Sequence, residues 1–217
     1  MQAAPPVPQA RGFGVVQPIG KLGAHTELVG EVVGHGVGEQ RAQQITTEAA
    51  NRGTRMHAYL EQYVLAGDMK PLPTNPYAHP SWFMAAEVIL NGLQHVDEFW
   101  GVEVPLYYPG LYAGTSDGCG LHLNEESILD YKQTNKPKKE EWIEDYKVQL
   151  VAYIMAHNEV YGTDIKEGHV FMCSRDLQYQ QFDLWPSDFN KYQDLWLSKV
   201  EEYYTTGLQG MKQLLTG

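Results

Sequence analysis

The fold is decided by the segment LYAGTSDGCGLHLNEESILDYKQT, residues 111–134, in which apolar and polar residues alternate at 121–124 and again at 129–132. Alternation with a period of two is typical of half-buried β-strands. The segment divides at NEES, residues 124–127, whose composition is typical of a hairpin connection. A similar run, FWGVEVPLYY at 99–108, precedes it. The sequence therefore predicts three successive strands joined by short turns.

Helical periodicity flanks these strands. Before them we expect two helices separated by a proline-rich loop, at 39–66, 81–96 and 69–80 respectively. After them we expect a helix, two strands and a last helix that opens at Pro186, with the first three near 139–160, 168–174 and 179–184. This order predicts an α/β fold with a mixed central β-sheet flanked by helices.

The first part of the chain has a different composition from the rest. Residues 1–38 are rich in Gly and Pro, which predicts a flexible or irregular N-terminal arm, and residues 39–217 are predicted to form the folded domain. Residues 1–26 contain two basic residues and no acid, so an organellar transit peptide stays open as the alternative to a plain arm.

Bulk composition narrows the class of protein. With 43% hydrophobic residues and no uninterrupted apolar run near 18 residues, the chain suits a globular protein with no membrane span. Two cysteines are too few for a disulfide framework or an iron–sulfur cluster, and we expect a reducing, cytoplasmic setting. The net charge of −11 argues against a passive DNA binder, which is typically basic, but not against an enzyme with a local basic channel.

Charged residues stand where the third strand should be buried. In Ile128-Leu-Asp-Tyr-Lys132, alternation places Asp130 and Lys132 on one face, with about 7 Å between their Cα atoms. Burying such charges is costly unless a metal or an ion pair compensates them. The simplest interpretation of these two residues by themselves is an Asp–Lys pair on an edge strand.

A second acid on the preceding strand changes that interpretation. Asp117 lies 13 residues before Asp130 across one hairpin, so the two carboxylates can converge. Taken by itself, Asp117 is most simply a turn aspartate. Two converging oxygen donors suit Mg²⁺ or Mn²⁺, and an adjacent lysine suits phosphodiester hydrolysis. Gly114 and Gly118 flank the acid, which indicates a bulge or a close backbone approach by a ligand.

These motifs together resemble the RecB-like branch of the PD-(D/E)XK nucleases, including the mitochondrial genome maintenance exonucleases and their phage relatives. The resemblance rests on GTSDG, ILDYK, the helix with Gln149 and Tyr153, and RGTRMH at 52–57, and it covers about residues 45–175. It implies a restriction-endonuclease-like core of order α-β-β-β-α-β. It further implies Asp117, Asp130 and Lys132 as catalytic residues, with a metal held by His57, Asp117, Asp130 and the carbonyl of Tyr131.

Other residues receive supporting roles. We expect Glu61, Gln149 and Tyr153 to orient His57 or to position substrate. For Gln149, a purely internal hydrogen-bond network is an equal alternative. A single histidine at the border of an apolar helix face is more often a packing residue than a metal ligand, so packing is the alternative for His57. Glu103 is interpreted as solvated or as supporting rather than catalytic. The predicted DNA-binding residues are Arg52, Arg55, Thr134, Lys136, Lys138 and Lys139. Aromatic residues that suit base stacking, although most should belong to the core, are Trp82, Phe83, Trp100 and Tyr112.

The expected function is therefore that of a Mg²⁺- or Mn²⁺-dependent deoxyribonuclease, an exonuclease acting on DNA ends or single strands in a bacterial or phage-infected cytoplasm. Two alternatives stay open, a non-catalytic DNA-binding or assembly protein on the same fold and a different metal-dependent phosphoesterase. The sequence leaves strand polarity, oligomeric state and pathway undecided.

Overall fold

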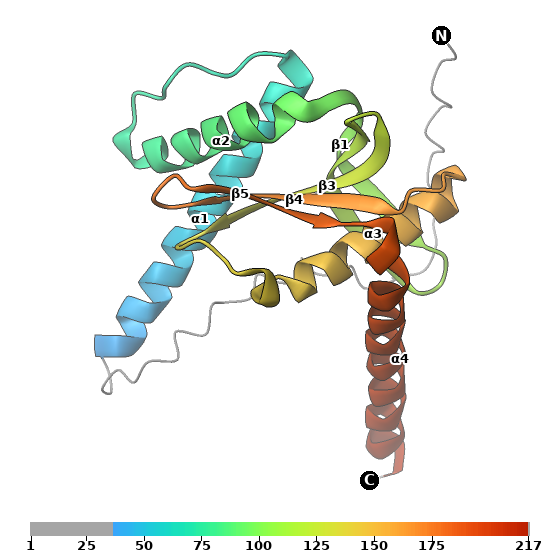
Figure 1. The fold of residues 1–217 in the computed structure, drawn as a ribbon. Helices are drawn as coiled ribbons and strands as arrows, with labels where there is room; N and C mark the ends of the chain where they lie inside the picture. Colours follow the sequence, from blue (N-terminus) through green and yellow to red (C-terminus); the bar gives the residue numbers. More distant parts are fainter. Residues whose placement is uncertain (1–36, 217) are drawn as a thin grey trace.

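A five-stranded mixed sheet forms the centre of the computed structural model, which describes residues 37–216 (Figure 1). The strand order is β1-β2-β3-β4-β5, so every strand lies beside its neighbour in the chain. Only β3 and β4 run parallel, and the other three pairs are antiparallel. The strands are β1 (Val96–Tyr108), β2 (Tyr112–His122), β3 (Glu125–Thr134), β4 (Glu167–Ser174) and β5 (Tyr179–Leu184).

Four helices accompany the sheet. They are α1 (Val37–Ala66), α2 (His79–Asn91), α3 (Glu144–Tyr161) and α4 (Pro186–Thr216). Helix α3 connects β3 to β4, as a parallel pair requires a long crossover. The predicted α/β fold with a mixed sheet flanked by helices is confirmed. The predicted arm lies almost wholly outside the described residues.

Each face of the sheet buries its own hydrophobic cluster. On one face Leu129 and Tyr131 of β3 pack with side chains of α1 and α2, including Met56 and Met84. On the other face Ile128 of β3 packs against α3 and α4. Figure 1 shows α2 and α3 on opposite sides of the strands. The strict alternation along β3 therefore determines which of its side chains meet which helices.

Several element boundaries differ from those predicted. The hairpin turn expected at 124–127 lies at Leu123–Asn124, because residues 125–127 belong to β3 and pair with β2. The helix expected at 81–96 begins earlier, at His79, and ends at Asn91, followed by a separate 3₁₀ turn, Leu93–His95. The helix expected at 139–160 begins at Glu144 instead, after another 3₁₀ turn, Glu140–Trp142. None of the helices within residues 37–216 combines the length and the apolar character that crossing a bilayer requires.

Candidate metal centre

Three acids lie at the same level on three neighbouring strands. The β1–β2 ladder pairs Val102 with Gly118 and Val104 with Ser116, which places Glu103 opposite Asp117 between them. The β2–β3 ladder has its last pair at Gly118 and Leu129, so one further step would set Asp117 opposite Asp130. We call Glu103, Asp117 and Asp130 the acidic row.

The sheet is interrupted along this row. Strand β3 continues to Thr134 beside β4, but its pairing with β2 stops at Leu129. Beyond that point a side-chain hydrogen bond replaces the backbone pairing between β2 and β3. Oδ2 of Asp117 accepts a hydrogen bond from the Tyr131 amide at 2.6 Å. Glu103 has a φ of 49°, a left-handed conformation that is uncommon for a residue with a side chain. The local backbone thus departs from regular sheet geometry where the acids gather.

Helix α1 brings an imidazole to the row. Its residue His57 lies with Nδ1 3.2 Å from Oδ1 of Asp117, while the ring stands edge-on to Tyr131 with centroids 6.1 Å apart. The two oxygens of Asp117 therefore have different neighbours, the imidazole on one side and the β3 backbone on the other. Asp117 itself is 8% exposed.

The predicted catalytic pair forms an ion pair on β3. Nζ of Lys132 lies 2.5 Å from Oδ2 of Asp130, and it also lies over the ring of Tyr146 in α3, 5.4 Å from the centroid. Asp130 is 2% exposed. The even-numbered positions of β3 face α3, and Cys119 of β2 belongs to the same cluster as Ile128. Alternation then places Asp117 on the same face as Asp130 and Lys132.

Burial and charge act against each other at these groups. Burial alone would raise the pKa of Asp117, but the adjacent His57, Lys132 and the Tyr131 amide lower it below its ordinary value. Burial lowers the pKa of His57, and the charge of Asp117 outweighs this, so the net shift is upward. Both groups are thus stabilised in their charged forms.

The pKa values of Asp130 and Lys132 are also shifted by burial and by neighbouring charges. Burial raises the pKa of Asp130 to about 6, with Asp117 adding to the rise and Lys132 opposing it. Burial would lower the pKa of Lys132, but Asp130 and Asp117 raise it above its ordinary value. Lys132 is therefore an ammonium ion, and Asp117 and Asp130 repel each other.

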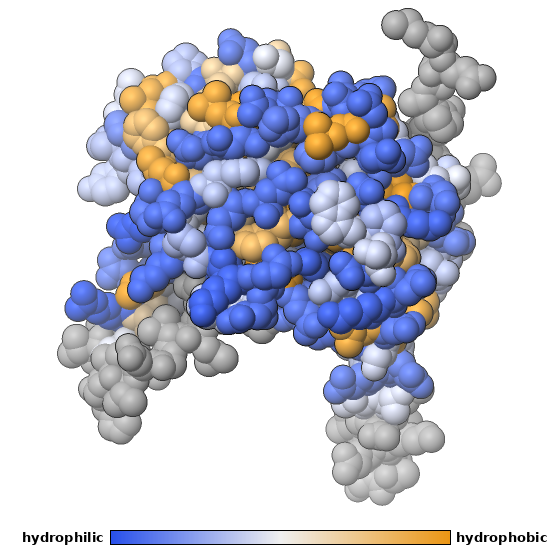
Figure 2. Space-filling view, viewed as in Figure 1, coloured by the Kyte–Doolittle hydropathy of each residue, from blue (hydrophilic) through white to orange (hydrophobic). Residues whose placement is uncertain are grey.

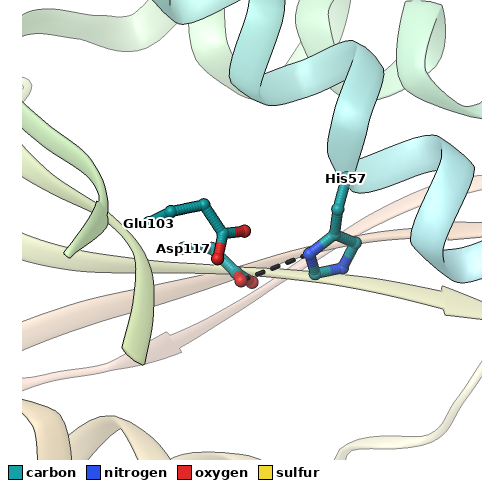
Figure 3. Close-up of side chains that lie close together, drawn as sticks. All are labelled: His57, Glu103 and Asp117. Atoms are coloured by element: carbon teal, nitrogen blue, oxygen red, sulfur yellow. Dashed lines mark ion pairs between the residues drawn. The ribbon is translucent and has the colours of Figure 1, made fainter. Parts of the chain in front are cut away.

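A divalent cation fits this donor set. One nitrogen of His57 and one carboxylate oxygen each of Glu103 and Asp117 lie within 4.8 Å of one another (Figure 3). Imidazole and carboxylate are common ligands of divalent metals. A cation would also offset the repulsion between the buried carboxylates, which their one lysine partner does not remove.

Sequence reasoning missed the position of Glu103, although a signal was present. Residues 103 and 117 are each seven positions from Gly110, the centre of the Pro109–Gly110 turn, and Gly110 has the positive φ of 74° that such a turn needs. Counting outward from that turn gives the pairing. The position of Glu103 is compatible with both interpretations, solvated and supporting, because its side chain is exposed and lies against His57 and Asp117.

The motif glycines make room for tyrosines of the site. A Cβ on Gly114 would lie 2.9 Å from Cε1 of Tyr153, and one on Gly118 would lie 3.1 Å from the hydroxyl of Tyr131. We expected a ligand or a bulge at these positions. The structure instead shows close contact with aromatic side chains, so a Cβ at Gly114 would force Tyr153 to shift and one at Gly118 would crowd the Tyr131 hydroxyl.

The supporting residues of α3 contact each other. Gln149 donates a hydrogen bond from Nε2 to the hydroxyl of Tyr153 at 2.9 Å. Burial, together with the charge of Asp130, raises the pKa of Tyr153 to about 12. Within the described residues, Oε1 of Gln149 has no hydrogen-bond partner, and no hydrogen bond or ion pair joins Glu61 to His57. Tyr153 is thus near the acidic row, and the expected orientation of His57 by Glu61 stays a prediction.

Two of the predicted DNA-binding residues are internal. Arg52 is 9% exposed and donates from Nε to Oε1 of Gln133 at 2.9 Å and from a terminal nitrogen to Oδ1 of Asn135 at 2.6 Å. Thr134 is 5% exposed, and its hydroxyl donates to the carbonyl of Lys136. Both side chains thus make hydrogen bonds at the end of β3, and their predicted contact with DNA stays a prediction.

The other predicted DNA-binding residues lie at the surface. Arg55, Lys136 and Lys139 are exposed, and Lys139 lies over the ring of exposed Trp142. Lys138 is half-buried, and its backbone is bound to the Gln180 side chain. The face seen in Figure 2 is mostly hydrophilic, with apolar residues in separate patches.

The aromatic residues considered for base stacking are already engaged. Tyr112 is 4% exposed and donates its hydroxyl to the carbonyl of Ala152, so it belongs to the core. Trp100 stacks on His157, and Trp82 donates to the carbonyl of Lys70. Phe83 packs edge-on against Trp82 and is 40% exposed. The expectation that most of this group is structural agrees with these contacts.

Known proteins resemble the chain in structure rather than in sequence. The chain matches no protein-family model and no curated protein. A protein of Eubacterium rectale, provisionally assigned as an exonuclease, aligns with a TM-score of 0.51 and 10% identity over 73% of this chain and 66% of its own, so the chain spans just under two thirds of its length. LHK-Exo, solved with dAMP, aligns with a TM-score of only 0.28 and 11% identity over 74% of this chain and 86% of its own. The first likeness supports a shared fold.

Proposed function

We propose that this chain is a metal-dependent deoxyribonuclease of the PD-(D/E)XK superfamily, RecB-like branch, acting as an exonuclease on DNA ends or single strands. The observation that carries the proposal is the interrupted row, where Asp117 and Asp130 come together beside the ammonium of Lys132. The shared fold with a protein assigned as an exonuclease supports the same class of activity. Its setting would be the cytoplasm of a bacterium or a phage-infected cell, in recombination or repair of DNA.

The residues divide the work of phosphodiester hydrolysis. Asp117, Asp130 and the Tyr131 carbonyl, with His57, would hold Mg²⁺ or Mn²⁺. The cation would polarise a phosphoryl oxygen and lower the pKa of a water molecule. Lys132 carries a positive charge that Asp130 orients, so it offsets negative charge on the phosphate in the transition state.

Substrate binding has to overcome an unfavourable overall charge. The net charge of −11 repels a polyanion, so the exposed Arg55, Lys136 and Lys139 must supply local attraction. Lys136 and Lys139 follow directly after β3, the strand of Asp130 and Lys132. Binding without the cation should consequently be weak and sensitive to salt.

Cleavage of labelled DNA by wild type and Lys132→Ala tests the proposal. Single-stranded and duplex DNA are incubated with Mg²⁺, Mn²⁺ or EDTA, and Lys166→Ala, which removes an exposed lysine paired with Asp164, serves as the control. We expect metal-dependent loss of DNA in wild type and control, and a rate at least about 10²-fold lower in Lys132→Ala. DNA binding without cleavage would favour a binding module, and cleavage of small phosphoesters alone would favour another phosphoesterase.

A further inference from the structure

Trp142 is a large aromatic residue that the fold leaves at the surface. Its helical spacing from Tyr146 and Leu150 would place it on the buried side of a helix. Helix α3, however, begins only at Glu144, and Trp142 ends the 3₁₀ turn before it. Ile143 is buried at this point with 1% exposure, whereas Trp142 is 57% exposed. Tryptophan is on average a highly buried residue, so its exposure here needs an explanation.

The exposed indole lies close to the proposed catalytic lysine. Nζ of Lys132 lies over the ring of Tyr146, 5.4 Å from the centroid. Trp142 precedes Tyr146 by four residues, and the amide of Tyr146 donates to the carbonyl of Ile143 to close the turn between them. The indole is therefore one turn of the chain away from the aromatic ring that contacts Lys132.

Lysines surround this indole. Nζ of Lys139 lies 5.2 Å from the ring centroid and 3.6 Å from Oε1 of Glu141, and the exposed Lys136 precedes it on the same loop. Glu140, the other acid of the turn, forms an ion pair with Lys147. Both acids thus lie beside a lysine, which reduces their repulsion of a phosphate. An aromatic ring among lysines is the combination that proteins use to bind single-stranded nucleic acids.

We propose that the Trp142 indole is a platform on which a base of single-stranded DNA stacks while a neighbouring phosphate lies at Lys132. The inference rests on the proposed function and deepens it, because it assigns single strands rather than blunt duplex as the preferred substrate. Bases of a single strand present their faces to a ring, whereas bases inside a duplex already stack on each other. Lys139 is exposed and can turn from the ring to a phosphate of the same strand.

Binding of labelled oligonucleotides in EDTA tests the platform without any cleavage. Fluorescence anisotropy at low ionic strength gives the Kd for a single strand of about 12 nucleotides, for the same strand with abasic sites throughout, and for a blunt duplex. The variants are Trp142→Ala and Trp142→Phe, of which the second keeps an aromatic face. Circular dichroism verifies that each variant is folded.

Trp185→Ala is the matched control, because it removes a second tryptophan that is 50% exposed. Trp185 follows the last residue of β5, Leu184. The residue of β5 that stands in line with Lys132 across β4 is Gln180, near the beginning of that strand. The control therefore changes an exposed indole at the other end of the sheet.

We expect Trp142→Ala to bind the ordinary single strand on the order of tenfold more weakly than wild type, and Trp142→Phe to lose no more than about threefold. Trp185→Ala should bind like wild type. On the abasic strand and the blunt duplex, Trp142→Ala should agree with wild type within about twofold, because no base face is available there. Undiminished binding of the ordinary strand, or an equal loss on the abasic strand, would overturn the inference.

Cleavage assays with Mg²⁺ or Mn²⁺ separate the failure of this inference from the failure of the nuclease function. If wild type cleaves DNA and Trp142→Ala binds single strands as well as wild type does, the nuclease function stands and the platform is rejected. If Trp142→Ala shows the base-dependent loss of binding but wild type cleaves no DNA with either metal, the platform stands and the nuclease function is rejected.

Discussion

Two polar clusters lie on the same sheet and share strands β2 and β3, and they are built differently. The acidic row lies where β3 leaves β2. The other cluster, which we call the histidine network, consists of His122, Ser127, His169 and Asp183 on strands β2 to β5. In it, His169 contacts Asp183 through Nδ1 at 2.7 Å and Ser127 through Nε2 at 3.2 Å.

The backbone hydrogen bonding between strands also differs between the two clusters. In the histidine network the ladder is continuous, with Ser127 paired to Glu167 and His169 paired to Asp183. Its one carboxylate receives hydrogen bonds from an imidazole and from Gln181. The acidic row has an interrupted ladder and carboxylates that repel each other. The contacts among Ser127, His169 and Asp183 indicate a structural role, and Nε2 of His122 is the atom of this network that has no hydrogen-bond partner among the described residues. Carboxylates that repel each other indicate a site for a cation.

Ser127, His169 and Asp183 lie in hydrogen-bond order, as the residues of a nucleophilic triad do. Two observations exclude that role in this conformation. Ser127 has no exposed surface, and its hydroxyl donates to the carbonyl of Glu125. The chain of contacts therefore ties three strands together and leaves no nucleophile accessible to a substrate.

The largest expected effect is on catalysis at the acidic row. In Asp130→Asn we expect the cleavage rate to fall at least about 10²-fold, because a metal donor and the partner of Lys132 are both weakened. Thermal unfolding in EDTA should occur at the same or a higher temperature, since a buried charge facing Asp117 is removed. Full activity, or a clearly lower midpoint, would erase the contrast between the clusters.

The opposite pattern is expected in the histidine network. Asp183→Asn should lower the free energy of unfolding by about 1–3 kcal/mol, because the buried imidazole of His169 loses its charged acceptor. Cleavage below the unfolding temperature should be unchanged. Urea titration and the DNA assay measure the two quantities, and impaired cleavage by fully folded Asp183→Asn would show that the network takes part in function.

Acid should weaken the histidine network through His122. Burial, followed by the charge of His169, lowers the pKa of His122 from 6.5 to about 4. Between these values the unfolded chain binds the proton more readily, so stability falls as pH drops through this window. In His122→Phe the loss between pH 7 and 4 should shrink by on the order of 1 kcal/mol. Unfolding curves of wild type and His122→Phe at several pH values measure this difference. If the substitution leaves the pH dependence of stability unchanged, the acid sensitivity belongs to other groups.

The smallest effect is expected at Ser127. Its replacement by Ala removes a hydroxyl from a satisfied network, which should cost about 1 kcal/mol and leave cleavage unaffected. Thermal denaturation measures the change in stability, and the DNA assay measures cleavage. Abolished hydrolysis in a folded Ser127→Ala protein would contradict the structural assignment of this serine.

The sequence predicted the fold well because the deciding features are local. Alternation of residue types and helical periodicity gave the order of elements. The hairpin turn lies at Leu123–Asn124 rather than across NEES, because Glu125, Glu126 and Ser127 are paired residues of β3, and this register is what brings Asp117 beside Asp130. Strand alternation also gave the shared face of Asp130 and Lys132. These features depend only on neighbours along the chain, so no tertiary information was needed.

What the sequence did not predict depends on packing between distant segments. The pairing of Glu103 with Asp117 could be counted from the turn at Gly110, but the left-handed backbone of Glu103 has no local signature between Val102 and Val104. Arg52 reads as a phosphate ligand until its partners, 81 and 83 residues later, are known. The start of α3 moved from 139 to Glu144 because a 3₁₀ turn intervenes. The contacts of Arg52 in particular needed partners that only the folded chain brings together.

The buried Arg52 has a consequence for how the site keeps its dimensions. The helix with His57 and the strand with Asp130 belong to different layers, and this guanidinium spans them by gripping two side-chain oxygens just past Lys132. We expect these hydrogen bonds to hold α1 at a constant distance from β3, and therefore the His57 imidazole at a constant distance from the carboxylates of Asp117 and Asp130. A lysine has the charge of Arg52 but not its planar guanidinium group. The substitution Arg52→Lys would therefore change the distances within the site without removing any of its metal ligands.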